Sequence, residues 1–341
     1  MSVSSKDCES LSNGAMVHCD VAIIGGGIVG LATAMTLREA EPGLHVHVVE
    51  AERNISTHQS GNNSGVLHSG LYYKPGSWKA IACKRGKELM EGFCDDEGVA
   101  WDRCGKVVVA TCESELQRLD MISERATANG VAHQRIHSDE LRRLEPHASG
   151  IAALHVPAAG IVNYRRVCDA MRARIERRGG LVTTQFDVQA VRYEGSRVVL
   201  VSRQGPKLSC QRFINCGGLR SDRISRLAGV QSDTKIVPFR GEYYELIPGR
   251  ESLCRNLIYP VPDPSFPFLG VHFTRMIDGG VECGPNAVLA LSRAGYRWRD
   301  VNATDLLETL RFGGFRKLAM RHWRTGAGEV YRSIRKQAFV T

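Results

Sequence analysis

Apolar residues recur along the chain with the spacings of both strands and helices. A mostly apolar run at 18–24 predicts a buried strand, and apolar residues at helical spacing after Gly30 predict a helix that stops at Pro42. A second apolar run at 45–50 predicts another strand that ends in Glu50. These segments together predict one βαβ unit.

The same patterns continue further along the chain. Predicted helices span residues 78–97, 113–129, 138–145, 164–178 and 221–227, and one or two amphipathic helices span 304–323. Predicted strands span residues 106–110, 181–186, 188–193, 197–202 and 208–215, and an antiparallel block spans 236–284. We therefore expect an α/β protein.

The length and composition are those of a globular protein with two domains. The chain has 341 residues, of which 43% are hydrophobic and 24% charged, which excludes disordered and collagen-like proteins. Its 11 cysteines form no C-x-x-C pair, so we predict neither a zinc site nor a disulfide framework, and no other metal site. This cysteine usage favours a reducing compartment.

No targeting segment or membrane span is predicted. Residues 1–19 mix Ser, Asp, Glu and Lys without an apolar stretch, unlike a secretory signal or a transit peptide. The apolar run 21–37 is about as long as the shortest membrane spans, but it holds four glycines and lies between Asp20 and Arg38. The βα interpretation of this run is therefore preferred.

The positive charge is concentrated near the C-terminus. The net charge is +9, and residues 293–341 hold eleven Lys and Arg against four Asp and Glu. This pattern fits a solvated helical face or association with a membrane surface. It lacks any nucleic-acid-binding motif, so we expect no nucleic-acid partner.

The strongest motif is Gly25-x-Gly27-x-x-Gly30. It follows a predicted strand, opens a predicted helix and precedes Glu50 by about 20 residues, the context of a dinucleotide-binding turn. The helix N-terminus would face the phosphates, and Glu50 would accept from a ribose hydroxyl.

The cofactor is either FAD or a nicotinamide on this motif alone. The following loop carries small and amide residues suited to a pyrophosphate or a flavin edge, which favours FAD: Ser60, Gly61, Asn62, Asn63 and Ser64. No second G-x-G-x-x-G occurs, so electrons would come directly from the substrate.

These residues and several later stretches resemble the L-2-hydroxyglutarate dehydrogenase family, flavoproteins of the D-amino-acid-oxidase-like superfamily. The resemblance covers about residues 18–310 and rests on the stretches 22–32, 58–75, 160–165, 236–243, 259–262, 266–274 and 284–287. It implies FAD-dependent oxidation of L-2-hydroxyglutarate, a 2-hydroxy dicarboxylate, to 2-oxoglutarate by hydride transfer. Electrons would pass to a quinone or an electron-transfer protein, in mitochondria or in association with a bacterial membrane.

The resemblance also narrows the candidate site residues. A dicarboxylate needs cations, and removal of a hydroxyl proton needs a base such as histidine. The catalytic candidates are His68, His272, Arg240 and Tyr243. Val188, Cys216 and Gly217 resemble superfamily positions that approach the cofactor.

The expected domains are interleaved. We predict a Rossmann-like FAD-binding domain over 18–84 and 150–230, and an α+β substrate domain on a largely antiparallel sheet over 85–149 and 231–300. Residues 301–341 form a basic helical segment that stops short of the family's final motifs, which predicts a truncated chain. A catalytically silent fragment is therefore an alternative, as is a related amino-acid or glycerol-3-phosphate oxidoreductase.

Overall fold

The computed structural model describes residues 16–263 and 270–340. The prediction about residues 1–19 falls mostly outside these ranges, as do residues 266–269 of one stretch that carries the resemblance. The chain forms two compact units, each built from three segments. Unit 1 comprises Met1–Asn63, Tyr164–Pro238 and Ala290–Phe315, and unit 2 comprises Ser64–Asn163, Phe239–Leu289 and Arg316–Thr341.

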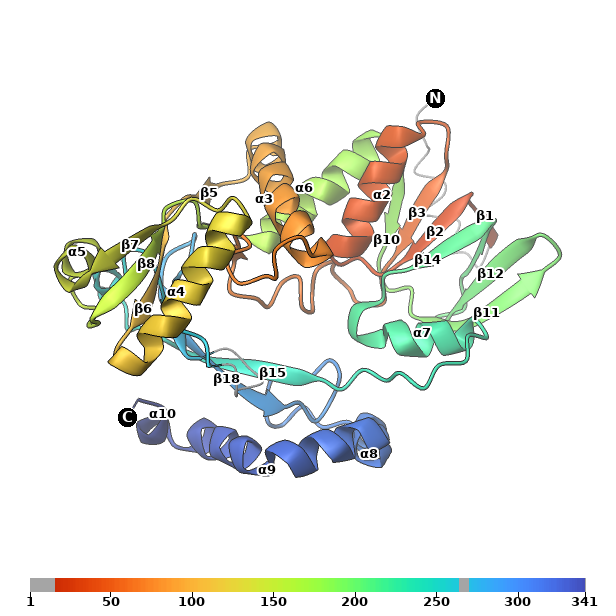
Figure 1. Ribbon diagram of the computed structural model, residues 1–341. Coiled ribbons are helices and arrows are strands. Elements are labelled where there is room, and N and C mark those ends of the chain that lie inside the picture. Colours follow the sequence, from red (N-terminus) through yellow and green to blue (C-terminus); the bar gives the residue numbers. More distant parts are fainter. Residues whose placement is uncertain (1–15, 264–269, 341) are drawn as a thin grey trace. The chain divides into compact units, whose positions relative to one another are not determined.

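Unit 1 is built on a four-stranded parallel sheet. Its strands, in spatial order, are β10 (Leu181–Thr183), β3 (Val46–Val49), β2 (Val21–Ile24) and β14 (Arg212–Asn215). Helices α2 (Ile28–Ala40) and α6 (Tyr164–Arg177) lie side by side against this sheet (Figure 1). Strand β3 is buried at all four positions, as expected of a parallel strand covered on both faces.

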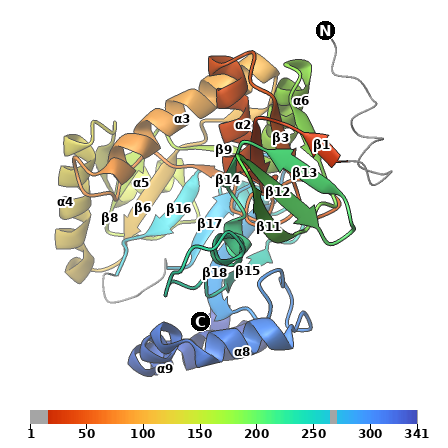
Figure 2. The ribbon, with the colours of Figure 1, turned by 90° about the vertical axis from the view of Figure 1, so that its right-hand side faces the viewer.

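A second four-stranded sheet packs against the parallel sheet within unit 1 (Figure 2). Its strands, in spatial order, are β1 (Met16–His18), β13 (Lys207–Cys210), β12 (Arg197–Ser202) and β11 (Val188–Glu194). Ala22, Ile24 and Val49 of the first sheet share a buried cluster with Leu200 and Leu208 of the second. The unit also contains η1 (Gly218–Arg220), α7 (Ser221–Leu227) and α8 (Ala303–Arg311).

Unit 2 is built on a seven-stranded sheet that is antiparallel except for the pair β16 and β6. The spatial order is β15 (Phe239–Glu245), β18 (Val281–Leu289), β17 (His272–Arg275), β16 (Leu257–Pro260), β6 (Lys106–Ala110), β8 (Ala152–Val156) and β7 (Gln134–His137). Helices α4 (Glu113–Ala128) and α5 (Ser138–Leu144) pack against it. Strand β6 alternates between them, with Val108 on the α4 side and Val107 on the α5 side.

The remaining elements of unit 2 surround this sheet. They are α3 (Trp78–Glu97), η2 (Glu251–Leu253), α10 (Lys336–Val340) and a small sheet of β4 (Val66–Leu67), β9 (Gly160–Val162) and β5 (Trp101–Asp102). Helix α9 (Gly313–Ile334) is bent at His322, and in unit 2 its Glu329 accepts a hydrogen bond from the Ala287 amide at 2.9 Å. None of the described helices is long and apolar enough to cross a membrane.

The predicted fold class is confirmed, with a parallel sheet in one unit and a largely antiparallel sheet in the other. The apolar run 21–37 forms strand β2 and helix α2, as preferred above. The single strand predicted at 208–215 is wrong, because the structure divides it at Gln211 into β13 and β14, which belong to different sheets. The Gln211 side chain donates to Asp20 at 2.8 Å and anchors this division.

Candidate functional site

The glycine motif forms the tight turn between β2 and α2 in unit 1. Gly25 has φ = +118°, and a Cβ there would collide with the carbonyl oxygen of Cys216. A Cβ at Gly30 would collide with the carbonyl oxygen of Gly25, so helix and strand meet only because both positions lack side chains. Gly27 precedes the first helical residue and has an extended backbone, with Ser60 Oγ 3.1 Å from where a Cβ would lie.

Two other predicted cofactor residues meet this turn. Glu50, directly after β3, accepts from the Gly26 amide at 2.6 Å with one carboxylate oxygen and from the Glu52 amide at 2.9 Å with the other. The Ser60 hydroxyl accepts from the Ile28 amide at 2.9 Å, at the start of α2. The turn therefore combines an anchored carboxylate, a hydroxyl and a helix N-terminus, the groups that bind ribose and phosphate.

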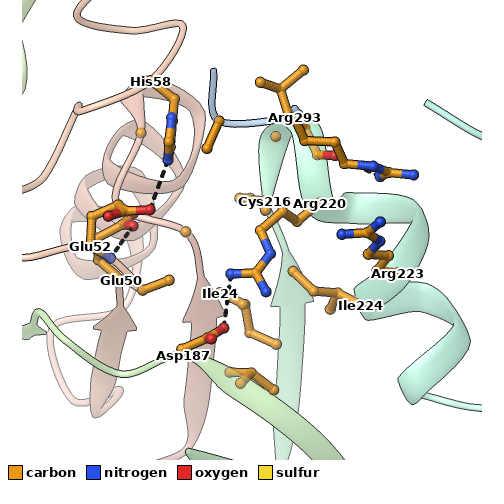
Figure 3. Close-up of a pocket in the computed structure, with 18 of the residues that line it drawn as sticks. Ile24, Glu50, Glu52, His58, Asp187, Cys216, Arg220, Arg223, Ile224 and Arg293 are labelled. Atoms are coloured by element: carbon orange, nitrogen blue, oxygen red, sulfur yellow. Dashed lines mark hydrogen bonds and ion pairs between the residues drawn. The ribbon is translucent and has the colours of Figure 1, made fainter. Parts of the chain in front are cut away.

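A pocket of about 520 Å³ opens beside this turn and lies wholly within unit 1 (Figure 3). Its wall includes seven residues predicted to contact the cofactor: Gly25, Gly27, Glu50, Ser60, Val188, Cys216 and Gly217. The volume lies within the range of small-molecule and cofactor sites. These residues fit the nucleotide half of FAD, because they come from a dinucleotide-binding turn and from the strand ends that flank it.

The other predicted loop residues shape the loop and do not line this pocket. Asn62 donates to the carbonyls of Thr57 and His58 at 2.8 and 2.9 Å. Asn63 donates to the Ser60 carbonyl at 2.8 Å, and the Gly61 carbonyl accepts from Arg165 Nε at 2.9 Å. These four contacts hold Ser60 beside the turn, whereas Ser64 belongs to unit 2.

The pocket also contains charged residues that the sequence analysis missed. Arg220 donates to Asp187 at 2.9 Å, and His58 lies 3.1 Å from Glu52 (Figure 3). Arg293 forms a buried ion pair with Asp222, at 2.9 Å between Nη2 and Oδ2. No local motif marks these residues: Arg220 with Asp187 and Arg293 with Asp222 join separate parts of the chain, and Glu52 with His58 pair within one irregular loop.

The predicted catalytic residues lie in unit 2, and the seven-stranded sheet brings His272 into a cluster. In the antiparallel pair of β16 and β17, Ile258 lies opposite Phe273, so Tyr259 and His272 share the other face. Their rings stack with centroids 4.0 Å apart. Lys106 of β6 lies in the same cluster, with Nζ 3.5 Å from the Tyr259 ring centroid.

His272 is held in one tautomer. Its Nδ1 lies 3.0 Å from the Gly270 carbonyl oxygen, which can only accept, so Nδ1 carries the proton and Nε2 is the basic nitrogen. Burial lowers the pKa of His272 to about 4, and the neighbouring charge of Lys106 acts in the same direction. The imidazole is therefore neutral at physiological pH.

His68 directly follows β4, and the charges of Lys106 and His272 affect its pKa. Its side chain keeps access to solvent, yet the surrounding protein lowers its pKa to about 4, aided by Lys106 and His272. Unit 2 thus brings both predicted histidines close to one buried lysine.

Arg240 and Tyr243 lie on β15 of the same sheet. Arg240 is buried, and its Nη2 donates to Glu242 Oε1 at 2.9 Å. Tyr243 is 38% exposed, and its ring lies where a Cβ of Gly284 would have to stand, so packing over this glycine positions the phenol. Burial raises the pKa of Tyr243, and the charge of Glu282 adds to this.

The sequence of this chain is similar to those of known flavin-dependent enzymes. The chain matches the family model described as "FAD dependent oxidoreductase" over residues 20–323. It is 48% identical over 321 residues to L-2-hydroxyglutarate dehydrogenase of Indibacter alkaliphilus, covering 94% of this chain and 80% of that protein. It is 41% identical to the mitochondrial L-2-hydroxyglutarate dehydrogenase of Homo sapiens, covering 92% and 70%.

Solved structures with the same fold are more distant in sequence. The FAD-bound L-α-glycerophosphate oxidase from Mycoplasma pneumoniae aligns with a TM-score of 0.75 at 23% identity, covering 83% of this chain and 76% of that one. The glycine oxidase from Geobacillus kaustophilus aligns with a TM-score of 0.69 at 18% identity, covering 88% and 78%. At these identities the likeness shows the shared fold.

Proposed function

The chain belongs to the FAD-dependent oxidoreductase family and, within it, to the L-2-hydroxyglutarate dehydrogenases, and from this premise we propose that it oxidises L-2-hydroxyglutarate to 2-oxoglutarate. The observation that carries the proposal is the 48% identity across 94% of the chain to a protein with that activity. The geometry of both units supports it, because one offers a dinucleotide-binding turn and the other a neutral histidine close to the buried Lys106.

FAD is the cofactor of this family, and when bound it supplies an acceptor for the hydride leaving the hydroxyl-bearing carbon. In unit 1, Gly25 and Gly27 leave room for the backbone to approach the pyrophosphate. Glu50 accepts from a ribose hydroxyl, and Val188 and Cys216 border the same pocket. We thus assign cofactor contacts to residues that are observed to line the pocket.

Unit 2 supplies the groups that act on the substrate. His272 Nε2 accepts the hydroxyl proton while the carbon loses its hydride, so the alcohol becomes a ketone and gives up two electrons and two protons. The fixed Nδ1 proton supports this assignment, because it leaves Nε2 as the proton acceptor. Arg240 binds a substrate carboxylate, and Tyr243 and His68 contribute polar contacts.

The electrons then pass to a second acceptor, a quinone or an electron-transfer protein. The relatives are bacterial and mitochondrial proteins. We accordingly place the protein in mitochondria if its source is eukaryotic, and otherwise in the cytoplasm, in association with a membrane surface through its basic C-terminal helices.

The test is an anaerobic absorbance spectrum of the chain supplied with FAD, recorded before and after addition of L-2-hydroxyglutarate. Bleaching of the bound flavin by the L-enantiomer, with no response to the D-enantiomer, is the expected result. Bound flavin that L-2-hydroxyglutarate does not bleach would contradict the proposed substrate. A chain that retains no flavin would favour the catalytically silent alternative.

A further inference from the structure

Lys106 is a buried cation that the reaction described above does not use. It is the first residue of β6 and is only 3% exposed, although lysine is almost never fully buried unless it is paired. Among the residues at 16–263 and 270–340, no carboxylate lies within 4.0 Å of its Nζ. The charge therefore lacks the partner that normally offsets burial.

Two aromatic rings surround the ammonium group. Nζ lies 3.5 Å from the ring centroid of Tyr259 and 4.6 Å from that of Tyr72. Contacts of this kind attract a cation to the face of the ring and favour its charged form. The ammonium group makes no hydrogen bond to the part of the chain that the structure describes, so its N–H donors remain available to an anion.

A second polar group in the same place also has no partner. The hydroxyl oxygen of Tyr72 is buried and makes no hydrogen bond to the part of the chain that the structure describes. An unsatisfied buried hydroxyl normally costs about 1–3 kcal/mol, so it tends to be retained where a ligand completes it. The ring that carries this hydroxyl has its centroid 4.6 Å from Lys106 Nζ, and a cation and a hydroxyl donor are both groups that bind a carboxylate.

The surrounding residues leave this cation dependent on a ligand. Desolvation lowers the pKa of Lys106 to about 7, which means that the protonated form is barely stable without an anion. His272 and His68 are neutral near pH 7, so they neither pair with the lysine nor repel it. An arriving carboxylate would stabilise the charged form of the lysine.

We propose that Lys106 Nζ and the Tyr72 hydroxyl form the binding site for one carboxylate of the dicarboxylate substrate, beside the base His272. This inference rests on the proposed function for the identity of the substrate. It adds a specificity-determining residue to the site and leaves the second carboxylate to Arg240. It also explains why a buried lysine begins an otherwise apolar strand.

Glutarate is a suitable probe, because it keeps both carboxylates and lacks the hydroxyl that is oxidised. Its dissociation constant would be measured by isothermal titration calorimetry on the FAD-loaded chain at pH 6.5. Lys106→Met is expected to raise this constant about 10- to 100-fold, the usual loss for a hydrogen bond to a charged group. The control Lys79→Met, at an exposed position on α3, should bind as the native chain does.

Flavin content and the unfolding temperature separate a binding role from a structural one. A structural lysine would lower the unfolding temperature when replaced, whereas removal of an unpaired buried charge should leave it unchanged or raise it. Tyr72→Phe deletes only the hydroxyl and should raise the glutarate dissociation constant several-fold. If Lys106→Met fails to retain flavin, the glutarate dissociation constant of Tyr72→Phe tests the carboxylate site instead.

The outcomes distinguish this inference from the proposed function. Native affinity for glutarate in Lys106→Met, or in Tyr72→Phe, would overturn the carboxylate site even if the native chain oxidises L-2-hydroxyglutarate. Weakened glutarate binding in both variants would support the site even if L-2-hydroxyglutarate failed to bleach the native flavin. In that case only the identity of the substrate would be wrong.

Discussion

The imidazole of His272 lies parallel to the phenol ring of Tyr259, with the planes inclined by 16° and the centroids 4.0 Å apart. This stacking covers one face of the histidine and, with the sheet around it, excludes the water that would stabilise an imidazolium ion. The pKa of His272 is consequently lowered to about 4. A base that is neutral over the whole physiological range follows from this packing.

The fall of kcat/KM on the acid side of its pH profile should therefore occur at an unusually low pH. If His272 is the base, kcat/KM should stay level down to about pH 5 and fall about tenfold per pH unit below about pH 4, since only the neutral imidazole accepts a proton. An ordinary histidine would place this fall near pH 6.5. Steady-state kinetics between pH 3 and 8 would measure it, and a fall in kcat/KM of the native chain that begins near pH 6.5 would contradict the assignment.

The two histidines can be separated by substitution. His272→Gln should lower kcat by about 10²- to 10⁴-fold, the usual contribution of a general base, while flavin binding persists. His68→Gln should lower kcat much less, because no carbonyl in the part of the chain that the structure describes fixes its imidazole in one tautomer, as the Gly270 carbonyl fixes that of His272. A larger loss for His68→Gln would transfer the role of base to His68.

The affinity for glutarate above neutral pH should depend on the protonation of Lys106. Glutarate binding should weaken as the pH rises through about 7, because deprotonation of Lys106 removes the charge that attracts the carboxylate. The other groups facing it do not titrate there: His68 and His272 are already neutral, and burial raises the pKa of Tyr72 and Tyr259 far above this range. Calorimetry from pH 6 to 9 measures the effect.

Lys106→Arg is the matched control for this pH dependence. Arginine stays protonated, so any binding that this variant retains should be independent of pH up to 9. If the native chain showed the same flat dependence, Lys106 would not be the titrating group.

Arg240→Ala should raise the KM for L-2-hydroxyglutarate about 10- to 100-fold and change flavin affinity little, because a carboxylate would lose a charged hydrogen-bond donor. The substitution also leaves Glu242 without its partner. The double variant Arg240→Ala with Glu242→Gln isolates the direct effect. Recovery of the native KM in the double variant would show that repulsion by Glu242 caused the loss.

Gly30→Ala should destabilise the chain by about 1–3 kcal/mol and reduce flavin retention, because the added methyl collides with the Gly25 carbonyl oxygen inside the cradle. Gly43→Ala is the control, since nothing lies within 4 Å of a Cβ at that position. Thermal unfolding and the ratio of flavin to protein absorbance measure both effects. Equal behaviour of the two variants would remove Gly30 from the cradle.

The features that could be predicted from the sequence depend on residues close together along the chain. The turn at Gly25–Gly30 with Glu50, and helix α3 over Trp78–Glu97, were predicted because spacing and capping signals lie within one or two elements. The two strands on either side of Gln211 were predicted as one, because the change from one sheet to the other leaves the apolar pattern unbroken.

The cluster around Lys106 could not be read in this way. Lys106 and Leu257 are paired across the parallel strands β6 and β16, and Tyr259 and His272 become neighbours through the antiparallel pairing of β16 with β17. The one available signal was a lysine at the head of the apolar run 106–110, which local periodicity treats as a strand end. Long-range register decides such sites, and a single sequence does not contain it.

Gln211 and Asp20, which are 191 positions apart, form a hydrogen bond, and contacts at this separation delay folding during synthesis. Strand β14 joins the parallel sheet beside β2, so the edge of β2 stays uncovered until residues near 215 have left the ribosome. Unit 2 has the same property, because β6 must wait for β16. We expect the nascent chain to need protection from aggregation during synthesis, and to become protease-resistant only after residues near 290 have emerged.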